Sequence, residues 1–395
     1  MSDQIQGTSV TVTVSSSDGL SAALRGAHAG DTILLAAGSY GPISIRGFHF
    51  DGTVTIQSAD SAHPAVLDGV TFSNSSGLAL ADVDITVNGP WAKGVSVTSS
   101  ANISMSGLTV HGVSGVDEGV GVSVRNSQGV TVSESGFTKI GSGIGHADSD
   151  SLTFSHNTFH DIRTDGIFGG GSSHVLVDAN SFTDFHPMPG DHPDAIQFFG
   201  GATGAHGSEV MVSNNIITRG TGEVIQGIFV EATGHITIVG NAMTGTAYNG
   251  ISLSTTDGAL VQDNFVQGFA DMGSRIITRG ESSNVTVVDN TSESVVTYND
   301  GGRPLPNYVA SDNTIIAGAA INDLSRINAW LATHVSSTPL APLIEVTGPV
   351  VTAPLGSSPA GGGFDFSPAN IEHLVQQAIA DQLHALSANN GWVML

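Results

Sequence analysis

The sequence predicts an all-β fold, a parallel β-solenoid, and three observations lead to it. The first is an internal repeat: a polar residue, a small residue and then Val or Ile recur six times between residues 118 and 254. Successive copies start 24, 23, 29, 32 and 23 residues apart, a period at which each repeat forms one coil and buries its apolar side against its neighbours. The copies are Glu118-Gly119-Val120, Ser142-Gly143-Ile144, Asp165-Gly166-Ile167, Asp194-Ala195-Ile196, Gln226-Gly227-Ile228 and Asn249-Gly250-Ile251, with a weaker seventh at Ser274-Arg275-Ile276.

The other two observations are the composition and a series of short apolar runs. The 51 glycines and the 12% of charged residues do not suit a helical repeat, which would be rich in Leu, Ala, Glu and Lys. The runs are rich in β-branched residues and bounded by Gly, Ser, Asn or Asp, as strands are. Examples are Val130-Thr131-Val132, Leu152-Thr153-Phe154, Val175-Leu176-Val177, Val210-Met211-Val212 and Ile236-Thr237-Ile238. We therefore expect coils of roughly 23–25 residues, each with two or three strands.

The elements follow in order along the chain. Residues 18–25 predict a short amphipathic helix that shields the exposed edge of the first coil, and strands are expected at 30–35 and 43–45. Coils then continue, so that residues 8–317 form one solenoid with its N-terminal cap. Residues 318–334 predict a second helix, which we expect to close the other end.

The C-terminal part differs in composition. Residues 335–366 are rich in Pro, Ser, Gly and Thr and predict a linker. Ser367-Pro368 then provides an N-cap and a first-turn proline for an amphipathic helix and tail over 367–395. Because its apolar stripe needs a partner, either the flank of the solenoid or another subunit, the chain is expected to be a monomer or a homo-oligomer formed through this helix.

Charge and composition limit the partners and the compartment. The net charge of −24 argues against nucleic-acid binding, and no stretch is apolar enough to span a membrane. The absence of cysteine excludes disulfides and thiol catalysis. With no Sec-type signal visible, the acidic, Gly-rich chain and its apolar end resemble substrates of bacterial type I secretion. We expect secretion of this kind; a cytosolic protein with a docked terminal helix is the alternative.

The repeat places residues of successive coils above one another. We expect the Val and Ile column to point inward and a turn at the small residue to swing the polar residue outward, because burying a polar column would be costly. Asp165 and Asp194 should then lie within roughly 5 Å of each other. Two adjacent carboxylates repel, so one must be protonated, bound to a cation or paired with a base.

The residues after the inward column should face solvent. Carboxylates beside outward aromatic rings on a β-surface are typical of a carbohydrate site, although Asp and Asn at strand starts also cap turns. The expected outward columns are Gly121, Gly145, Phe168, Gln197, Phe229 and Ser252, and then Ser123, Ala147, Gly170, Phe199, Glu231 and Ser254. From this surface we expect Gln197, Phe168, Phe199, Phe229, Glu231, His146, Asp191 and Arg275 to contact substrate.

Two insertions mark the face on which a site is expected. Residues 186–193 and 201–208 stretch the coils beside Asp165 and Asp194, and insertions in repeat proteins form loops on one face, often the binding face. The first carries His192, which Pro193 stiffens and flanking acids make more basic. Cations of which several could converge on this groove and bind a uronate carboxylate by paired hydrogen bonds are Lys139, Arg163, Arg219, Arg275 and Arg279.

An asparagine column is predicted to be structural. Asparagine tolerates left-handed backbone and can stack as a hydrogen-bonded ladder at a coil corner. The column consists of Asn157, Asn180, Asn215, Asn241 and Asn264.

The N-terminal segments Leu20-Ser21-Ala22-Ala23-Leu24, Gly30-Asp31-Thr32-Ile33-Leu34-Leu35 and Gly38-Ser39-Tyr40 resemble the cap and first coil of right-handed parallel β-helix proteins that act on acidic polysaccharides. These are pectate-lyase-like and alginate-lyase-like enzymes and mannuronan C5-epimerases. The resemblance implies a single-stranded right-handed parallel β-helix. The epimerases' Asp-Pro-His-Asp/Glu segment is absent, and Asp191-His192-Pro193-Asp194 is similar only in composition. Paired Asp residues also echo pectinase-type hydrolases, whose Gly-His-Gly element is missing.

The leading hypothesis is a lyase that cleaves a uronic-acid-containing polysaccharide by β-elimination. This reaction needs a neutralised carboxylate, a base for the C5 proton and an acid for the leaving oxygen. We expect His192 as the base, oriented by Asp191, with Lys139 second. Ca²⁺ held by Asp165, Asp194 and Glu231, or Arg163 or Arg219 directly, would neutralise the carboxylate; no organic cofactor is expected.

Three alternatives remain open. A C5-epimerase would use the same site and return the proton to the opposite face. A glycoside hydrolase would use Asp165 and Asp194 as its two carboxylates. A glycan-binding or tailspike-like protein would have no catalysis at all.

Overall fold

The computed structural model describes residues 9–113, 119–201, 207–298 and 303–334. They belong to one compact unit, Met1–Leu340. The predicted linker at 335–366 and the predicted helix and tail at 367–395 lie outside the described residues. No helix within the described ranges has the length and apolar character that crossing a membrane requires.

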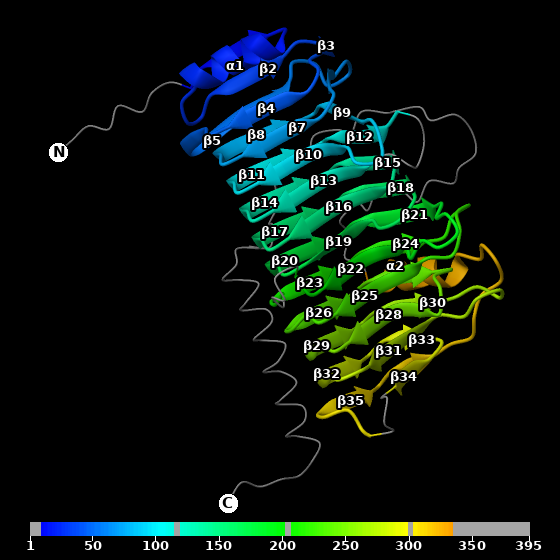
Figure 1. The fold of residues 1–395 in the computed structure, drawn as a ribbon. Coiled ribbons are helices and arrows are strands. Elements are labelled where there is room, and N and C mark those ends of the chain that lie inside the picture. The colour runs from blue at the N-terminus through cyan, green and yellow to red at the C-terminus, as the bar shows by residue number, and fades with distance from the viewer. Residues whose placement is uncertain (1–8, 114–118, 202–206, 299–302, 335–395) are drawn as a thin grey trace, which may run out of the picture. The chain divides into compact units, whose positions relative to one another are not determined.

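The described chain is a parallel β-helix of three sheets, and each coil contributes one strand to each sheet (Figure 1). The 13-stranded sheet contains β1 (Thr11–Val14), β2 (Thr32–Leu35), β5 (His49–Ser58), β8 (Ser76–Ala81), β11 (Ala101–Ser106), β14 (Gln128–Ser133), β17 (Asp150–Ser155), β20 (Ser173–Asp178), β23 (Val210–Ser213), β26 (Ile236–Val239), β29 (Asp257–Gln262), β32 (Ser283–Val288) and β35 (Tyr308–Ser311). The 11-stranded sheet contains β4 (Ile43–Arg46), β7 (Val70–Ser73), β10 (Lys93–Thr98), β13 (Val120–Arg125), β16 (Ser142–Ala147), β19 (Ile167–Gly170), β22 (Asp194–Phe199), β25 (Gln226–Glu231), β28 (Asn249–Ser254), β31 (Arg275–Arg279) and β34 (Val295–Tyr298). The 12-stranded sheet contains β3 (Gly38–Ser39), β6 (Ala65–Leu67), β9 (Asp84–Val87), β12 (Thr109–Gly112), β15 (Gly136–Ile140), β18 (Thr158–Ile162), β21 (Ser181–Phe185), β24 (Ile216–Thr218), β27 (Ala242–Thr244), β30 (Phe265–Gln267), β33 (Thr291–Ser292) and β36 (Thr314–Ile315).

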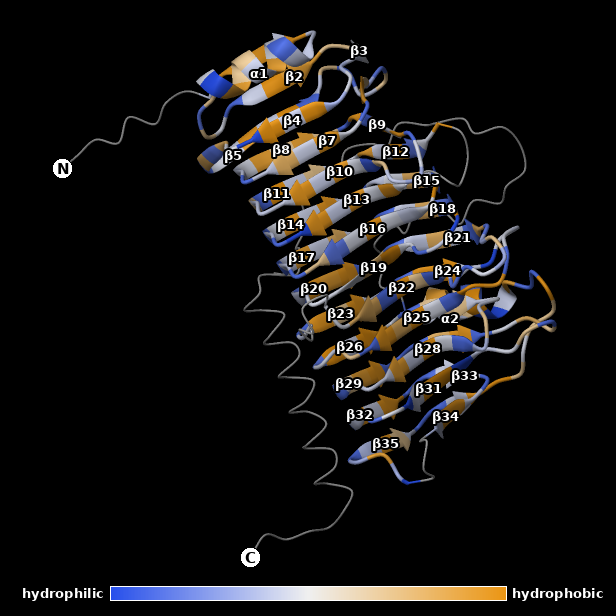
Figure 2. Ribbon diagram, in the orientation of Figure 1, coloured by the Kyte–Doolittle hydropathy of each residue, from blue (hydrophilic) through white to orange (hydrophobic). Residues whose placement is uncertain are grey.

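The predicted inward column is confirmed. In the 11-stranded sheet, strand pairing stacks Ile144, Ile167, Ile196, Ile228 and Ile251 on one another, and all are fully buried. Figure 2 shows apolar segments recurring from strand to strand along the solenoid.

The small residue of the repeat is required by an aromatic stack in the core. Phe137, Phe159 and Phe182, from the 12-stranded sheet, stack with ring centroids 4.8 Å apart. A Cβ at Gly143 would lie 2.5 Å from the Phe159 ring, and one at Gly166 would lie 2.5 Å from Phe182. A larger residue at either position would therefore clash with a ring that cannot move within the stack.

The first copy of the repeat was aligned two residues too early. The strands pair Val120 with Ser142 and Val122 with Ile144, so the true equivalent of Ser142-Gly143-Ile144 is residues 120–122. Both Gly119 and Gly121 precede a valine, so the pattern fits either alignment and only the strand pairing selects one. As a result, Ser123 and Arg125 start the two outward columns, in place of Gly121 and Ser123.

The asparagine ladder is confirmed, and it forms the corner between the 13-stranded and 12-stranded sheets. Asn157 N donates to Asn180 Oδ1 at 2.9 Å, and Asn180 N donates to Asn215 Oδ1 at 3.0 Å. These side chains are completely buried. The left-handed backbone belongs to the residue before each asparagine, such as His156 at φ 57°, rather than to the asparagine itself.

The two helices have different roles. Helix α1 (Ser17–Gly26) is N-capped by Ser16, whose Oγ accepts a hydrogen bond from Gly19 N at 3.1 Å, and its Leu20 and Leu24 join the core at the N-terminal end, as predicted (Figure 1). Helix α2 (Ser325–His334) does not close the other end, so that prediction is wrong. It packs on the outer face of β27 and β30, because Ala242 and Phe265 face outward there and are covered by Ile327 and Trp330.

Candidate functional site

A column of polar side chains lies at the start of successive strands in the 11-stranded sheet. Asp165 precedes β19, while Asp194, Gln226 and Asn249 open β22, β25 and β28. The backbone N of Asp194 donates to Asp165 Oδ1 at 3.0 Å, so the expected proximity of the two acids is confirmed. The expected exposure is wrong for three members, because Asp194 is 0% exposed, Asn249 2% and Gln226 7%, whereas Asp165 is half-buried.

The 186–193 insertion, whose His192 contacts Asp194 and Gln226, is held in place by an ion pair. Arg163 donates from Nε to Asp191 Oδ2 at 2.8 Å and from Nη2 to Asp191 Oδ1 at 3.0 Å. Asp191 Oδ2 also accepts from Met188 N at 2.8 Å. This bidentate pair is a strong, directional contact, and it fixes the loop that carries His192. Asp191 therefore positions the loop, and the expectation that it orients His192 directly is wrong.

His192 is the exposed member of the site. Its side chain is 64% exposed, and its Nδ1 lies 3.1 Å from Oδ2 of the fully buried Asp194. Its Nε2 lies 2.8 Å from the amide Nε2 of Gln226. The Gln226 Oε1 in turn accepts from Asn249 Nδ2 at 2.7 Å.

These contacts determine which ring nitrogen of His192 carries the proton. Because Asn249 donates to Oε1 of Gln226, the Gln226 amide nitrogen must face His192 and donate to its Nε2. Nε2 is then an acceptor, and in the neutral imidazole the proton lies on Nδ1, which donates to Asp194. The hydrogen bonds thus run in one direction, from Asn249 to Gln226 to His192 to Asp194, and leave the basic lone pair on Nε2.

Both acids are harder to ionise than an ordinary Asp. Burial, together with the charge of Asp165, raises the pKa of Asp194 to about 8. Burial also raises the pKa of Asp165 to about 6, against the hydrogen bond from Asp194 N, which lowers it. The Oδ1 of Asp194 is buried without a hydrogen-bond partner. Near neutral pH, therefore, Asp194 holds a proton and Asp165 carries the negative charge.

Aromatic rings line the outer face of the same sheet, as predicted. The Phe168 ring lies over Gly145, where a Cβ would approach it to 2.8 Å, and Phe199 lies over Gly170 in the same way. Phe229 is 8% exposed, and the His192 ring meets it edge-on with centroids 6.0 Å apart. Gln197 lies in the outward column between Phe168 and Phe229 and remains a predicted substrate contact.

Three of the predicted residues do not belong to this cluster. His146 is 4% exposed and lies between Phe154 and Phe198 in the core, where burial lowers its pKa to about 4. It cannot contact a surface glycan, and that assignment is wrong. Arg219, 8% exposed in its side chain, is held by Asp271 at 2.7 Å and by Gly245 O at 2.9 Å. The positive charge of Arg219 is therefore paired with Asp271 within a loop.

Lys139 is the third such residue. It is exposed at the end of β15 and stacks in one column with Asp161 and Asp184, as expected from the repeat. Those two acids hold loops: Asp161 contacts His186 Nε2 at 3.1 Å, and Asp184 accepts from Thr221 N. Within the described residues, no contact joins Lys139 to His192 or to Asp194, so its role as a second base stays a prediction.

The predicted calcium site does not fit the geometry. Asp194 pairs with Gln226 at the start of neighbouring strands, whereas Glu231 ends β25 five residues later, about 16 Å along the strand. One ion cannot contact both. Among the described residues, no group of three or more His, Asp or Glu side chains is arranged to hold a metal ion. Ca²⁺ takes six to eight oxygen ligands, so Asp165 and Asp194 alone do not make such a site.

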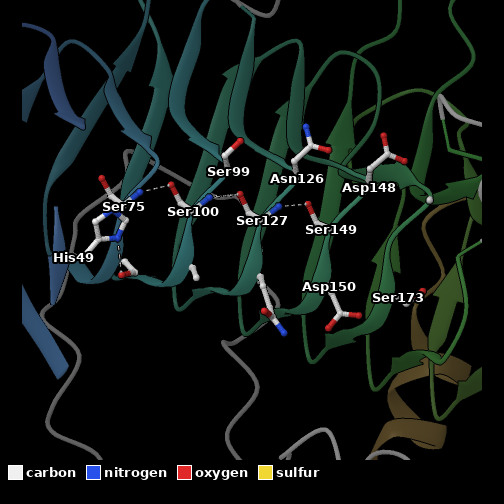
Figure 3. A pocket seen from close by; sticks show the side chains of 14 residues that line it. His49, Ser75, Ser99, Ser100, Asn126, Ser127, Asp148, Ser149, Asp150 and Ser173 are labelled. Carbon is white, nitrogen blue, oxygen red and sulfur yellow. Dashed lines mark hydrogen bonds between the residues drawn. The ribbon is translucent and has the colours of Figure 1, made fainter. Parts of the chain in front are cut away.

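A polar groove of about 860 Å³ lies along the corner between the 11-stranded and 13-stranded sheets, at the opposite end of the strands from His192 (Figure 3). Its floor is a ladder of serines in which Ser75 N, Ser100 N and Ser127 N each donate to the next serine Oγ at 3.1–3.2 Å. These serine hydroxyls stabilise this corner by hydrogen bonds. The asparagine ladder does the same at the corner between the 13-stranded and 12-stranded sheets.

The sequence alone does not indicate the role of Gln226 and Asn249 beside His192, whereas Arg279 is among the cations expected to line the groove. Gln226 and Asn249 were identified only as members of the repeat, although the repeat itself places them beside Asp194. Arg279, at the end of β31, has its guanidinium Cζ 5.4 Å from the centre of the Phe229 ring. Glu231 pairs with Ser254, and Ser254 pairs with Arg279, so Arg279 belongs to the same outward column.

Comparisons with known proteins agree with this architecture. The chain matches the family described as "Right handed beta helix region" over residues 32–184, 93–266 and 142–321. No curated protein matches its sequence. Among solved structures it is similar to the Dettilon tailspike protein, with 16% identity and a TM-score of 0.52 over 77% of this chain and 64% of that one.

Two further solved structures are similar at the level of the fold. One is the GH136 lacto-N-biosidase from Eubacterium ramulus, with 12% identity and a TM-score of 0.50 over 80% of this chain and 68% of that one. The other is an alginate lyase from Paenibacillus sp. str. FPU-7, with 16% identity and a TM-score of 0.47 over 77% and 99%. The similarity to the tailspike protein and the lacto-N-biosidase is one of fold alone, and it leaves the activity to the site itself. The chain belongs to the right-handed β-helix family.

Proposed function

We propose that this protein is a polysaccharide lyase that cleaves a uronic-acid-containing glycan by β-elimination. The observation that carries the proposal is the pairing of an exposed imidazole with a buried acid. The His192 side chain is 64% exposed, its Nδ1–H is held by Asp194 at 3.1 Å, and its Nε2 accepts a hydrogen bond from the Gln226 amide at 2.8 Å. An imidazole held in this tautomer can accept one proton from a substrate and share the resulting charge with the acid beneath it.

The proposed step begins when the substrate displaces the Gln226 amide from Nε2. Nε2 then takes the proton from C5 of the uronate, and the C5–H electrons form the C4–C5 double bond. The C4–O bond breaks, and its electrons leave with the oxygen, which takes a proton from the imidazolium or from water. Once Asp194 is ionised, above its raised pKa of about 8, it stabilises the transient imidazolium, because a carboxylate beside the ring favours its charged form.

The burial of Asp194 favours this reaction over glycoside hydrolysis. A hydrolase needs one carboxyl group that reaches the glycosidic oxygen and a second that activates water or attacks the sugar. Asp194 is 0% exposed and lies beneath His192, so a glycosidic oxygen would meet the imidazole before the carboxyl group. The exposed group at the site is therefore a base of the kind that elimination requires.

The reaction class is tested by incubating the protein with a panel of acidic polysaccharides and following two products. Rising ultraviolet absorbance from an unsaturated uronate supports the lyase. New reducing ends without that absorbance indicate a hydrolase, and exchange of the C5 hydrogen without cleavage indicates an epimerase. Because the carboxylates do not form a calcium site, lyase activity should persist in a chelator such as EDTA.

A further inference from the structure

We infer that Arg279 and Arg275 form an anion-binding subsite beside His192 that recognises the carboxylates of an acidic glycan. The inference rests on the proposed function for its ligand class. Its physical basis is independent: two arginines on one strand, β31, are each placed on an aromatic ring at the outer face of the sheet. Cations are scarce in this chain, with 11 Lys and Arg against 35 Asp and Glu, so two on one strand create a local positive field in an acidic surface.

Each guanidinium is held by a ring face rather than by an acid. Arg279 Cζ lies 5.4 Å from the Phe229 ring centre, and Arg275 Cζ lies 5.5 Å from that of Tyr248. Both distances are within the range of a cation–π contact. Among the described residues, neither arginine has a carboxylate within 4.0 Å, whereas Arg163 and Arg219 are both paired with acids. Stacking orients the guanidinium but leaves its charge and its N–H edge for a ligand.

The position of Arg279 relative to the base follows from Phe229. The His192 ring contacts one part of Phe229 with centroids 6.0 Å apart, and the Arg279 guanidinium lies 5.4 Å from the same ring. The sum of these two distances is the largest possible separation, so the His192 imidazole and the Arg279 guanidinium are no more than about 11 Å apart. A sugar chain passing over His192 and Arg279, which both lie against the buried Phe229 ring, could reach both groups.

The second arginine extends the subsite along the axis of the solenoid. Arg275 pairs with Asn249, the last amide of the polar column, across neighbouring strands. Tyr248, which is 52% exposed, lies just before Asn249. Arg275 is thus three strands beyond Asp194, roughly 14 Å at the spacing of paired strands. Glu231 belongs to the same outward column, two strands before Arg279.

This arrangement fits a carboxylated sugar. A guanidinium binds a carboxylate through two parallel hydrogen bonds, while the exposed Tyr248 ring offers an apolar face to a pyranose. A sulfate ester would present the same charge, so the shared chemistry is an anionic sugar substituent, and sulfated oligosaccharides form a separate arm of the test.

The subsite is tested by binding, without catalysis, in a His192→Ala background. Calorimetry would compare an oligouronate with the same oligosaccharide after its carboxyl groups are reduced to alcohols, and with a sulfated one. The parent should bind the oligouronate and lose about tenfold or more in affinity for the reduced form, as expected when a charge-assisted hydrogen-bond pair is lost. Arg279→Gln should lose a similar factor for the oligouronate only, and Arg275→Gln a smaller one.

Arg125→Gln is the matched control, because Arg125 ends β13 at the start of the same outward column and is exposed. It should change affinity by less than about twofold, and thermal unfolding should show that all variants fold. Equal affinity of the Arg279→Gln variant and its parent, or of the reduced and acidic sugars, would overturn the subsite. Lyase activity with unchanged binding in Arg279→Gln rejects the subsite alone, whereas charge-selective binding in a wild-type protein without lyase activity rejects the proposed function alone.

Discussion

His192 Nδ1 lies 3.1 Å from Asp194 Oδ2, and this contact joins a side chain that is 64% exposed to one that is 0% exposed. The imidazole closes the surface over the acid, so the two residues act as one unit. Protons and the His192 ring reach the Asp194 carboxyl group, but a substrate does not. Burial raises the pKa of Asp194 to about 8, so its charge changes within the range in which a lyase would work.

Stability should fall as pH rises from about 4 to about 8. The folded-state pKa of Asp194 is raised above the ordinary value of 3.8, so in this window the folded chain binds a proton that the unfolded chain has lost. One such proton costs roughly 1.4 kcal/mol of unfolding free energy per pH unit. Because the pKa of Asp165 is also raised, to about 6, Asp194→Asn should remove the slope between about pH 6 and 8 and be more stable than wild type at pH 8, measured by urea unfolding.

Asp257→Asn provides the control for that experiment. Hydrogen bonds from Ser283 and Asn284 lower the pKa of Asp257, so its contribution changes only below the acidic limit of this window. The Asp257→Asn variant should keep the wild-type slope between pH 4 and 8. A wild-type slope that persists in Asp194→Asn between about pH 6 and 8 would contradict the burial of an ionisable Asp194.

Activity should rise with pH as Asp194 ionises. A carboxylate under Nδ1 makes the imidazole a stronger base than a neutral carboxylic acid does, so kcat/KM should increase through an apparent pKa of about 8. In Asp194→Asn this limb should disappear, and the activity should be lower by about tenfold or more. If the pH dependence of kcat/KM is the same in Asp194→Asn and in the wild type, Asp194 takes no part in the reaction.

The hydrogen-bond chain from Asn249 should set the tautomer of His192. In the wild type, ¹⁵N spectra should show the proton on Nδ1, because Gln226 donates to Nε2 at 2.8 Å and is itself held by Asn249 at 2.7 Å. Gln226→Leu should mix the two tautomers and lower kcat more than it raises KM. Finding the proton on Nε2 in the wild type would reverse the assignment of the basic nitrogen.

Arg163 should act on the site through the loop. Arg163→Gln removes both hydrogen bonds to Asp191, so amide exchange should accelerate in residues 186–193, and kcat/KM should fall by about tenfold. Arg219→Gln is the matched variant, because it also breaks an arginine–aspartate pair, with Asp271. It should lower stability but leave exchange in the 186–193 loop unchanged. Equal exchange in the two variants would remove Arg163 from its positioning role.

The parts of the fold that depend on the repeat period could be predicted from the sequence. The isoleucine column and the asparagine ladder both follow from spacing alone, and so does the proximity of Asp165 to Asp194. The burial of Asp194 beneath His192 could not be predicted, because His192 lies on an insertion whose position is fixed by the Arg163–Asp191 pair, 28 residues apart. The outward position of the acids was inferred from the cost of burying charge, and raised pKa values reduce that cost.

Other features depend on contacts between strands that the pattern does not specify. Arg279 reaches Phe229 across two intervening strand pairings, and the length of its side chain decides that contact. His146 was assigned to the surface because it lies near the repeat, but its strand position points it inward beside Phe198. Helix α2 was expected at the end of the solenoid because the outward apolar pair Ala242 and Phe265 was not recognised as a surface to be covered.

The most direct test is the rate of unsaturated-uronate formation in His192→Ala compared with His235→Ala. His235 is a close match, with a side chain 60% exposed and its Nδ1 3.1 Å from Glu209 Oε1. If His192 takes the C5 proton, its variant should lose at least about a hundredfold in kcat while keeping wild-type stability, and the His235 variant should retain full activity. Equal rates in the wild type and the His192→Ala variant would contradict the central claim.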